Sequence, residues 1–324
     1  MTSATFKTLA KALLVGASLA STFALAQAFP ARTVTLVVPY APGGSTDILA
    51  RVVAQHLPAQ LGQAAVVENR TGGGGVVGWS SVARAPADGH TLLTNEMSFP
   101  ISAALLPNMP FDPKTAFTHL TIAAQVPHVL VVHPSVPANN VKELVAHARA
   151  NPGKLNYGSG GNGTNTHMGA ELFKSLTGTF MTHIPYRGGG AALQDVLAGQ
   201  VQWMVTALPG ALPHIKSGKV RALMVTSNER SSVAPDIPSA KESGLDMDVQ
   251  FWLGFSAPAC TPPATLARLQ KDIATVLALP EVKKRLGDMG FTTIASSPAE
   301  AHKLIDSEMQ RWARVIKTSG IKAD

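Results

Sequence analysis

Two glycine-rich stretches contain the groups with which this chain could hold a small anion. Residues 40–47 read Tyr-Ala-Pro-Gly-Gly-Ser-Thr-Asp, and residues 156–167 read Asn-Tyr-Gly-Ser-Gly-Gly-Asn-Gly-Thr-Asn-Thr-His. Each stretch leads into a segment with helical spacing of apolar residues. Glycines at the start of a helix expose backbone N–H groups, which can hold an anion without a formal positive charge. We therefore predict an anion site in a cleft between these two loops.

The elements around the loops alternate between strand and helix. Apolar, β-branched runs predict strands at 33–39, 64–68, 90–94, 120–124, 128–133, 155–158, 182–185, 201–205, 220–226 and 249–258. Apolar residues three and four positions apart predict helices after most of them, and two long helices at 262–279 and 299–318. This alternation indicates an α/β protein with largely parallel sheets, in which loops at the carboxyl ends of strands bind ligands.

The composition excludes several classes of partner and cofactor. The 324 residues are enough for two domains, and 45% of them are hydrophobic while 15% are charged. The net charge of +7 is scattered along the chain without a basic block, so we expect no nucleic-acid partner. A lone cysteine, Cys260, excludes an intramolecular disulfide and a cysteine-cluster metal site. We expect no metal and no cofactor.

Residues 1–28 have the pattern of a secretory signal. Lys7 and Lys11 precede a short apolar run at 13–25, and Ala26-Gln-Ala28 is a small-residue cleavage site. No later stretch stays apolar for the roughly 20 residues that a membrane span needs. We expect cleavage near Ala28 and an exported protein that is not embedded in the membrane.

The glycine loops and their flanking residues together resemble one family. Residues 29–47, 68–75, 87–93, 151–157, 183–188 and 215–223 are similar to motifs of the extracytoplasmic solute receptors of tripartite tricarboxylate transporters, the Bug or TctC type of periplasmic binding protein. The resemblance implies a type II periplasmic-binding-protein fold, with two α/β lobes joined by two crossing strands. Lobe 1 would comprise residues 29–129 and 250–324, and lobe 2 would comprise residues 130–249.

The resemblance also implies a function and a site. Such receptors capture a small carboxylate in the cleft and deliver it to the inner-membrane permease subunits of the transporter; we expect a monomer without catalytic residues. The ligand-binding positions implied in lobe 1 are Ala41, Pro42, Gly43, Gly44 and Asp47. Those implied in lobe 2 are Ser159, Gly160, Asn162, Gly163, Thr164 and His167. Asp47 could instead stabilise a helix start, and His167 could instead hydrogen-bond the loop.

Thr206 marks a departure from the family pattern. Family members commonly have an aspartate after the strand at 201–205, where this chain has Thr206. An acid in the cleft would pair with the amine of an amino acid. Its loss favours a plain carboxylate, so we add Thr206 to the predicted site.

Two other functions share these residues. Ser159, His167 and Asp195 could form a nucleophilic triad, which would make the protein an exported serine-dependent hydrolase, although the chain lacks a G-x-S-x-G elbow at Ser159. Alternatively, the protein could bind its ligand as an accessory of a sensor kinase.

Overall fold

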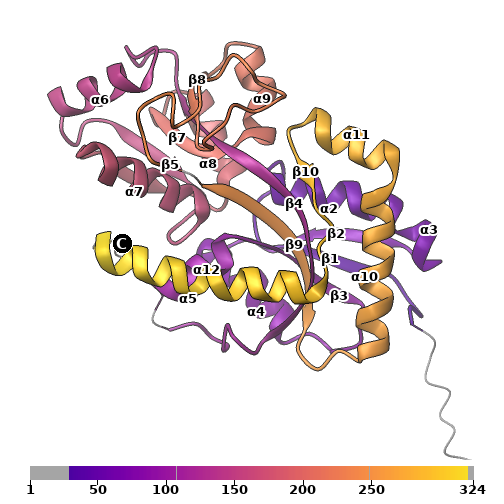
Figure 1. The fold of residues 1–324 in the computed structure, drawn as a ribbon. Coiled ribbons are helices and arrows are strands. Elements are labelled where there is room, and N and C mark those ends of the chain that lie inside the picture. Colours follow the sequence, from indigo (N-terminus) through magenta and orange to yellow (C-terminus); the bar gives the residue numbers. More distant parts are fainter. Residues whose placement is uncertain (1–28, 107, 248, 320–324) are drawn as a thin grey trace, which may run out of the picture.

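A computed structural model describes residues 29–106, 108–247 and 249–319. The predicted signal at residues 1–28 lies outside the described residues. The strands form a mixed sheet in the order β2-β1-β3-β9-β4-β7-β5-β6, and β8 and β10 also pair with β4. Figure 1 shows the two ends of this sheet as separate lobes, each covered by its own helices.

Lobe 1 is built on three parallel strands and two antiparallel strands. The strands are β1 (Val34–Val38), β2 (Ala65–Asn69), β3 (Thr91–Glu96), the antiparallel β9 (Gln250–Pro258) and the short β10 (Thr292–Thr293). The helices are α2 (Ser45–His56), α3 (Pro58–Leu61), α4 (Val76–Ala83), α5 (Ser98–Leu105), α10 (Pro263–Ala278), α11 (Pro280–Asp288) and α12 (Pro298–Ser319), with a 3-10 turn η2 (Gly73–Gly75) before α4. The 40–47 loop therefore joins β1 to α2, at the carboxyl end of a parallel strand.

Lobe 2 repeats this arrangement with a smaller sheet. Its strands are β5 (Asn156–Ser159), β6 (Thr182–Pro185), β7 (Trp203–Ala207) and β8 (Arg221–Val225). Its helices are α6 (Val141–Ala150), α7 (Asn165–Thr177), α8 (Gly189–Leu197) and α9 (Leu208–Lys216). Because β5 runs parallel to β6 and β7, the loop before α7 and the glycine turn before α8 lie at the same edge of the sheet.

One long strand, β4 (Phe117–Val132), connects the lobes (Figure 1). Its residues 117–127 pair with β9, and its residues 128–132 pair with β7 and β8. The prediction of two separate strands here was wrong, because residues 125–127 continue the pairing with β9. The chain returns from lobe 2 to lobe 1 between β8 and β9, and this is the second connection. Just before β9 begins, the Val249 N–H donates to the Thr226 carbonyl (3.1 Å).

The predicted α/β fold, with lobes joined by two crossing strands, is confirmed. The lobe boundaries predicted at 129/130 and 249/250 stay a prediction; β4 changes its pairing partners between Pro127 and His128.

His128 makes the fold sensitive to acid. It is fully buried at the point where β4 changes partners, and its ring stacks on Phe251. Burial lowers the pKa of His128 to about 4, from about 6.5 in an unfolded chain, although the neighbouring Asn165 side chain opposes the shift. Burial also lowers the pKa of His119 to about 4.

We expect the free energy of unfolding to fall as the pH drops from 6.5 to 4, because the unfolded chain binds protons there that the folded protein excludes. The pKa shift of His128 corresponds to a loss of about 3 kcal/mol in the free energy of unfolding. Urea unfolding of the wild type and of His128→Leu at pH 7 and pH 4.5 measures this loss. The variant should lose less stability on acidification; an identical loss in both proteins would contradict this assignment.

Candidate functional site

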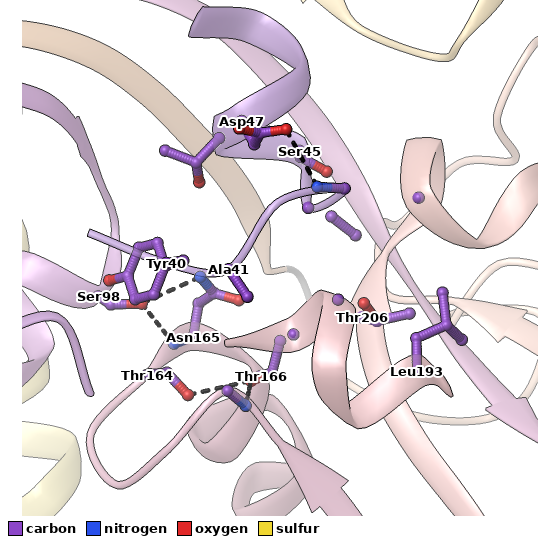
Figure 2. Close-up of a pocket in the computed structure, with 18 of the residues that line it drawn as sticks. Tyr40, Ala41, Ser45, Asp47, Ser98, Thr164, Asn165, Thr166, Leu193 and Thr206 are labelled. Carbon is purple, nitrogen blue, oxygen red and sulfur yellow. Dashed lines mark hydrogen bonds between the residues drawn. The ribbon is translucent and has the colours of Figure 1, made fainter. Parts of the chain in front are cut away.

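A cavity of about 50 Å³ lies between the two lobes, at the carboxyl ends of β1, β5 and β7 (Figure 2). The predicted site residues that line it are Ala41, Gly43, Gly44, Asp47, Gly160, Thr164 and Thr206. Residues that the sequence analysis did not assign to the site also line it: Tyr40, Ser45, Thr46, Ser98, Asn165, Thr166, Gly189, Gly190, Leu193, Ala207, Gly210 and Phe251. The tertiary structure thus brings both predicted loops to one cavity.

Five predicted site residues do not line this cavity. They are Pro42, Ser159, Asn162, Gly163 and His167. Ser159 is fully buried and shares a hydrogen bond with His183 Nε2 (2.6 Å). The Gly163 carbonyl accepts a hydrogen bond from Ser102 Oγ (3.2 Å), across the lobes. The Gly163 N–H donates to His167 Nδ1 (3.3 Å), so His167 holds the loop as the alternative interpretation expected. A ligand role for these five residues stays a prediction.

Several backbone amides of the 156–167 loop already have acceptors, within the loop or on lobe 1. The Gly160 N–H donates to Thr166 Oγ1 (2.7 Å), and the Gly161 N–H donates to Ser159 Oγ (3.1 Å). The Asn165 N–H donates to Ser98 Oγ of lobe 1 (2.8 Å). These three amides are therefore already paired, so this loop contributes the start of α7 and a shaped wall rather than a row of free donors.

Five helices begin at the cavity wall. They are α2, α5, α7, α8 and α9, whose first residues or preceding caps line the space. The first N–H groups of an α-helix have no partner within the helix, and the helix dipole makes this end positive. Thr164 caps α7 by accepting a hydrogen bond from the His167 N–H, whereas α2, α8 and α9 have no side-chain cap hydrogen bond. The backbone groups at these helix starts therefore contribute positive partial charge to the cavity.

Asp47 is the one charged residue among the described residues that line the cavity. Its carboxylate accepts hydrogen bonds from the Gly43 N–H (3.0 Å), Arg51 Nε (2.9 Å) and Asn69 Nδ2 (2.9 Å). Burial raises the pKa of Asp47, but these hydrogen bonds outweigh burial and hold the pKa below its ordinary value. Asp47 is thus ionised at neutral pH and already paired, which fits the alternative interpretation that it stabilises the start of α2.

The Ser45 hydroxyl supplies a further polar group at the cavity. Ser45 is the first residue of α2, and its Oγ is buried without a hydrogen-bond partner in the part of the chain that the structure describes. Figure 2 shows it beside Asp47, at the start of α2. Because buried hydroxyls nearly always have a partner, this donor is available for a ligand.

The remaining wall is mostly apolar. Leu193 of α8, Ala207 at the end of β7 and Phe251 of β9 line it. Thr206, next to Ala207 on β7, is buried and places its side chain at the same wall (Figure 2). A ligand held by the helix starts would contact this wall with the part that lies away from its anionic group.

Glycines allow the lobes to approach closely. A Cβ on Gly190 would lie 2.9 Å from the Pro42 carbonyl oxygen, and one on Gly188 would lie 2.9 Å from the Ala41 nitrogen. The Ala41 N–H donates to the Arg187 carbonyl (3.3 Å) across the same gap. The sequence shows three consecutive glycines at 188–190, but their proximity to the 40–47 loop depends on tertiary structure.

The groups of the alternative hydrolase triad have other partners. Asp195 accepts a hydrogen bond from Tyr186 OH (2.7 Å), and Ser159 is paired with His183. Among the described residues, no group of three or more His, Cys, Asp or Glu side chains could hold a metal ion. Within the same residues, no helix combines the length and hydropathy of a membrane span.

Comparison with known proteins gives consistent similarities. Residues 49–321 match the model of the tripartite tricarboxylate transporter family receptor. The chain is 36% identical to Protein BugT of Bordetella pertussis over 300 residues, which are 92% of this chain and 92% of BugT.

Three solved structures are similar over nearly their whole length. Periplasmic binding protein BugD has a TM-score of 0.88 and 32% identity, covering 91% of this chain and 99% of BugD. MatC from Rhodopseudomonas palustris, solved with bound malate, has a TM-score of 0.86 and 33% identity, covering 89% and 100%. A second R. palustris protein, Rpa4515 solved with adipate, has a TM-score of 0.87 and 34% identity, covering 91% and 99%.

Proposed function

Because this chain belongs to the tripartite tricarboxylate transporter receptor family, we propose that it captures a small organic carboxylate between its lobes and delivers it to an inner-membrane permease. The resemblance found in the sequence is confirmed by the family match and by the similarity to BugT. The predicted periplasmic-binding-protein fold is confirmed by the similarity to BugD. The family is one of solute-binding receptors.

The observation that supports a carboxylate is the convergence of five helix starts on a cavity with no cationic lining residue among the described residues. A hydrogen bond to a charged group contributes roughly 1.5–3 kcal/mol, whereas micromolar binding needs about 8 kcal/mol. Several donors from both lobes are therefore required. The first turns of α2 and α8, together with Ser45 Oγ, offer them. Malate and adipate in the solved relatives are ligands of this chemistry.

The cavity favours a carboxylate that lacks an amine. An ammonium group needs an anionic partner, but Asp47 is already occupied by Arg51 and Asn69. Thr206 provides no charge at the opposite wall. An amino acid would therefore leave its ammonium group unpaired in the cavity, so we propose plain organic acids as the ligands.

The proposed cellular setting follows from the family and the N-terminal residues. The protein is exported, and its signal is removed near Ala28. The mature monomer binds the ligand in the periplasm and carries it to the permease. The family description supports a permease as the partner rather than a sensor kinase. No catalytic step is proposed.

A thermal-shift screen of the mature protein tests the ligand class. Malate, succinate, adipate, citrate and benzoate are compared with the amino acids aspartate and glutamate and with glucose. At 100 times its dissociation constant, a ligand adds roughly 2.7 kcal/mol to the free energy of unfolding, so we expect at least one plain carboxylate to raise the Tm by several degrees. A response to amino acids or glucose, with none to the plain acids, would contradict the proposal.

An esterase assay separates the receptor from the alternative hydrolase. We expect no turnover of p-nitrophenyl esters by the wild type, because Ser159 is fully buried and Asp195 is engaged by Tyr186. Turnover that disappears in Ser159→Ala would establish the hydrolase instead.

A further inference from the structure

A buried group of polar residues, which we call the Glu96 cluster, joins the lobes next to the cavity. It consists of Tyr40, Glu96 and Ser98 of lobe 1 and Asn165 of lobe 2. Tyr40 follows β1, Glu96 ends β3, Ser98 begins α5 and Asn165 begins α7. Figure 2 shows Tyr40, Ser98 and Asn165 together at one side of the cavity.

Asn165 makes three hydrogen bonds to the opposite lobe. Its Nδ2 donates to Glu96 Oε2 (2.8 Å) and to Ser98 Oγ (3.0 Å), and its backbone N–H donates to Ser98 Oγ (2.8 Å). These bonds exist only while the lobes are together, because their donors and acceptors lie on different lobes.

Lobe 1 holds the Glu96 carboxyl in position for this contact. Tyr40 OH donates to its Oε1, and the Ser98 N–H donates to its Oε2 (2.7 Å). Glu96 and Ser98 are fully buried, and Asn165 is 7% exposed. A carboxyl group that is buried at the contact between the lobes needs such donors, since an unpaired polar group in this position would oppose the contact.

We propose that Asn165 is a positioning residue for ligand capture. Through Glu96 and Ser98 it holds the lobes together, and it keeps the closed conformation populated when no ligand is bound. This role is independent of the identity of the ligand. Asn165 sets the helix start of α7 at the wall before an anion arrives, so closure does not depend on ligand contacts alone. Its loss therefore shifts the protein toward the open form.

Two substitutions test the role of Asn165. Asn165→Leu removes both Nδ2 hydrogen bonds and leaves Glu96 without its donor from lobe 2. Asn165→Asp keeps the shape and places a second carboxyl against Glu96. An acidic residue in the first turn of α7 interacts favourably with the helix dipole, so we expect Asn165→Asp to keep the wild-type Tm while it opens the cleft.

The closed fraction is measured by double electron–electron resonance on ligand-free mature protein. Nitroxide labels are attached at Val77→Cys of α4 and Lys142→Cys of α6, in a Cys260→Ser background. We expect the wild type to show a short-distance, closed component. In both Asn165 variants, the amplitude of this short-distance component should fall by at least half. The double variant Asn165→Asp/Glu96→Gln should recover part of it, because the facing carboxyl pair is gone.

Asn140→Asp is the matched control. It introduces the same charge change at a helix start of lobe 2, where Asn140 caps α6 at the exposed surface. The closed component should be unchanged in this variant. A wild-type distance distribution that matches both Asn165 variants would overturn the proposal. Because no ligand is added, this result is separate from success or failure of the carboxylate screen.

Discussion

Gly190→Val is expected to weaken carboxylate binding at least 100-fold while leaving the fold intact. A Cβ at Gly190 would lie 2.9 Å from the Pro42 carbonyl oxygen and 3.4 Å from the Gly44 nitrogen. The valine would therefore separate the starts of α8 and α2, whose N–H groups we propose as donors to the ligand. A 100-fold loss corresponds to about 2.8 kcal/mol, which is the energy of one or two charge-assisted hydrogen bonds.

The backbone at Gly190 accepts this change. Gly190 is the second residue of α8 and is not among the glycines with positive φ, so a side chain there causes no backbone strain. We expect the Tm of the ligand-free variant to stay close to that of the wild type. Isothermal titration calorimetry, with the carboxylate that gives the largest thermal shift, measures the loss.

Gly287→Val is the control for Gly190→Val. Gly287 lies in α11, and a Cβ there would meet no atom within 4 Å. Its carboxylate affinity should equal that of the wild type. Unchanged affinity in Gly190→Val as well would mean that the ligand binds outside the gap between the 40–47 loop and α8.

Thr206→Asp is expected to reverse the charge preference of the cavity. Thr206 is buried in the cavity wall, so a carboxylate there would lie close to the bound anion. Two like charges about 4 Å apart repel by about 4 kcal/mol at an effective dielectric constant of 20. We expect at least a 100-fold loss of affinity for succinate or malate. The same carboxylate would pair with an ammonium group, so the ratio of aspartate to succinate affinity should rise by a similar factor.

Thr206→Val separates charge from shape. It keeps the branched side chain and removes the hydroxyl, so we expect its affinity for plain acids to remain within about tenfold of the wild type, the value of one hydrogen bond. Calorimetry with paired succinate and aspartate titrations measures both variants. An unaltered ligand profile in Thr206→Asp would show that Thr206 does not contact the bound molecule.

Local patterns in the sequence were sufficient for the class of fold and for the two loops. Glycine turns depend on local backbone conformation, and strands and amphipathic helices depend on burial of one face. Both properties can be recognised from residues that are close together in the sequence. The two loops predicted at 40–47 and 156–167 both contribute residues to the wall of one cavity. No helix was predicted at α5, because its consecutive residues 98–102 are all buried and no glycine turn precedes it, so Ser98 stayed unassigned.

The sequence by itself determined that this chain is an α/β receptor of a carboxylate-transport family with glycine loops at its strand ends. Tertiary structure alone decided which backbone groups remain available to a ligand. In the 156–167 loop, Thr166 and Ser159 accept hydrogen bonds from the loop amides, whereas α2, α8 and α9 begin uncapped at the cavity. The reason is physical: whether a donor is free depends on every acceptor that the fold brings within 3 Å. Some of those acceptors come from distant parts of the chain, as Ser98 does for the Asn165 N–H.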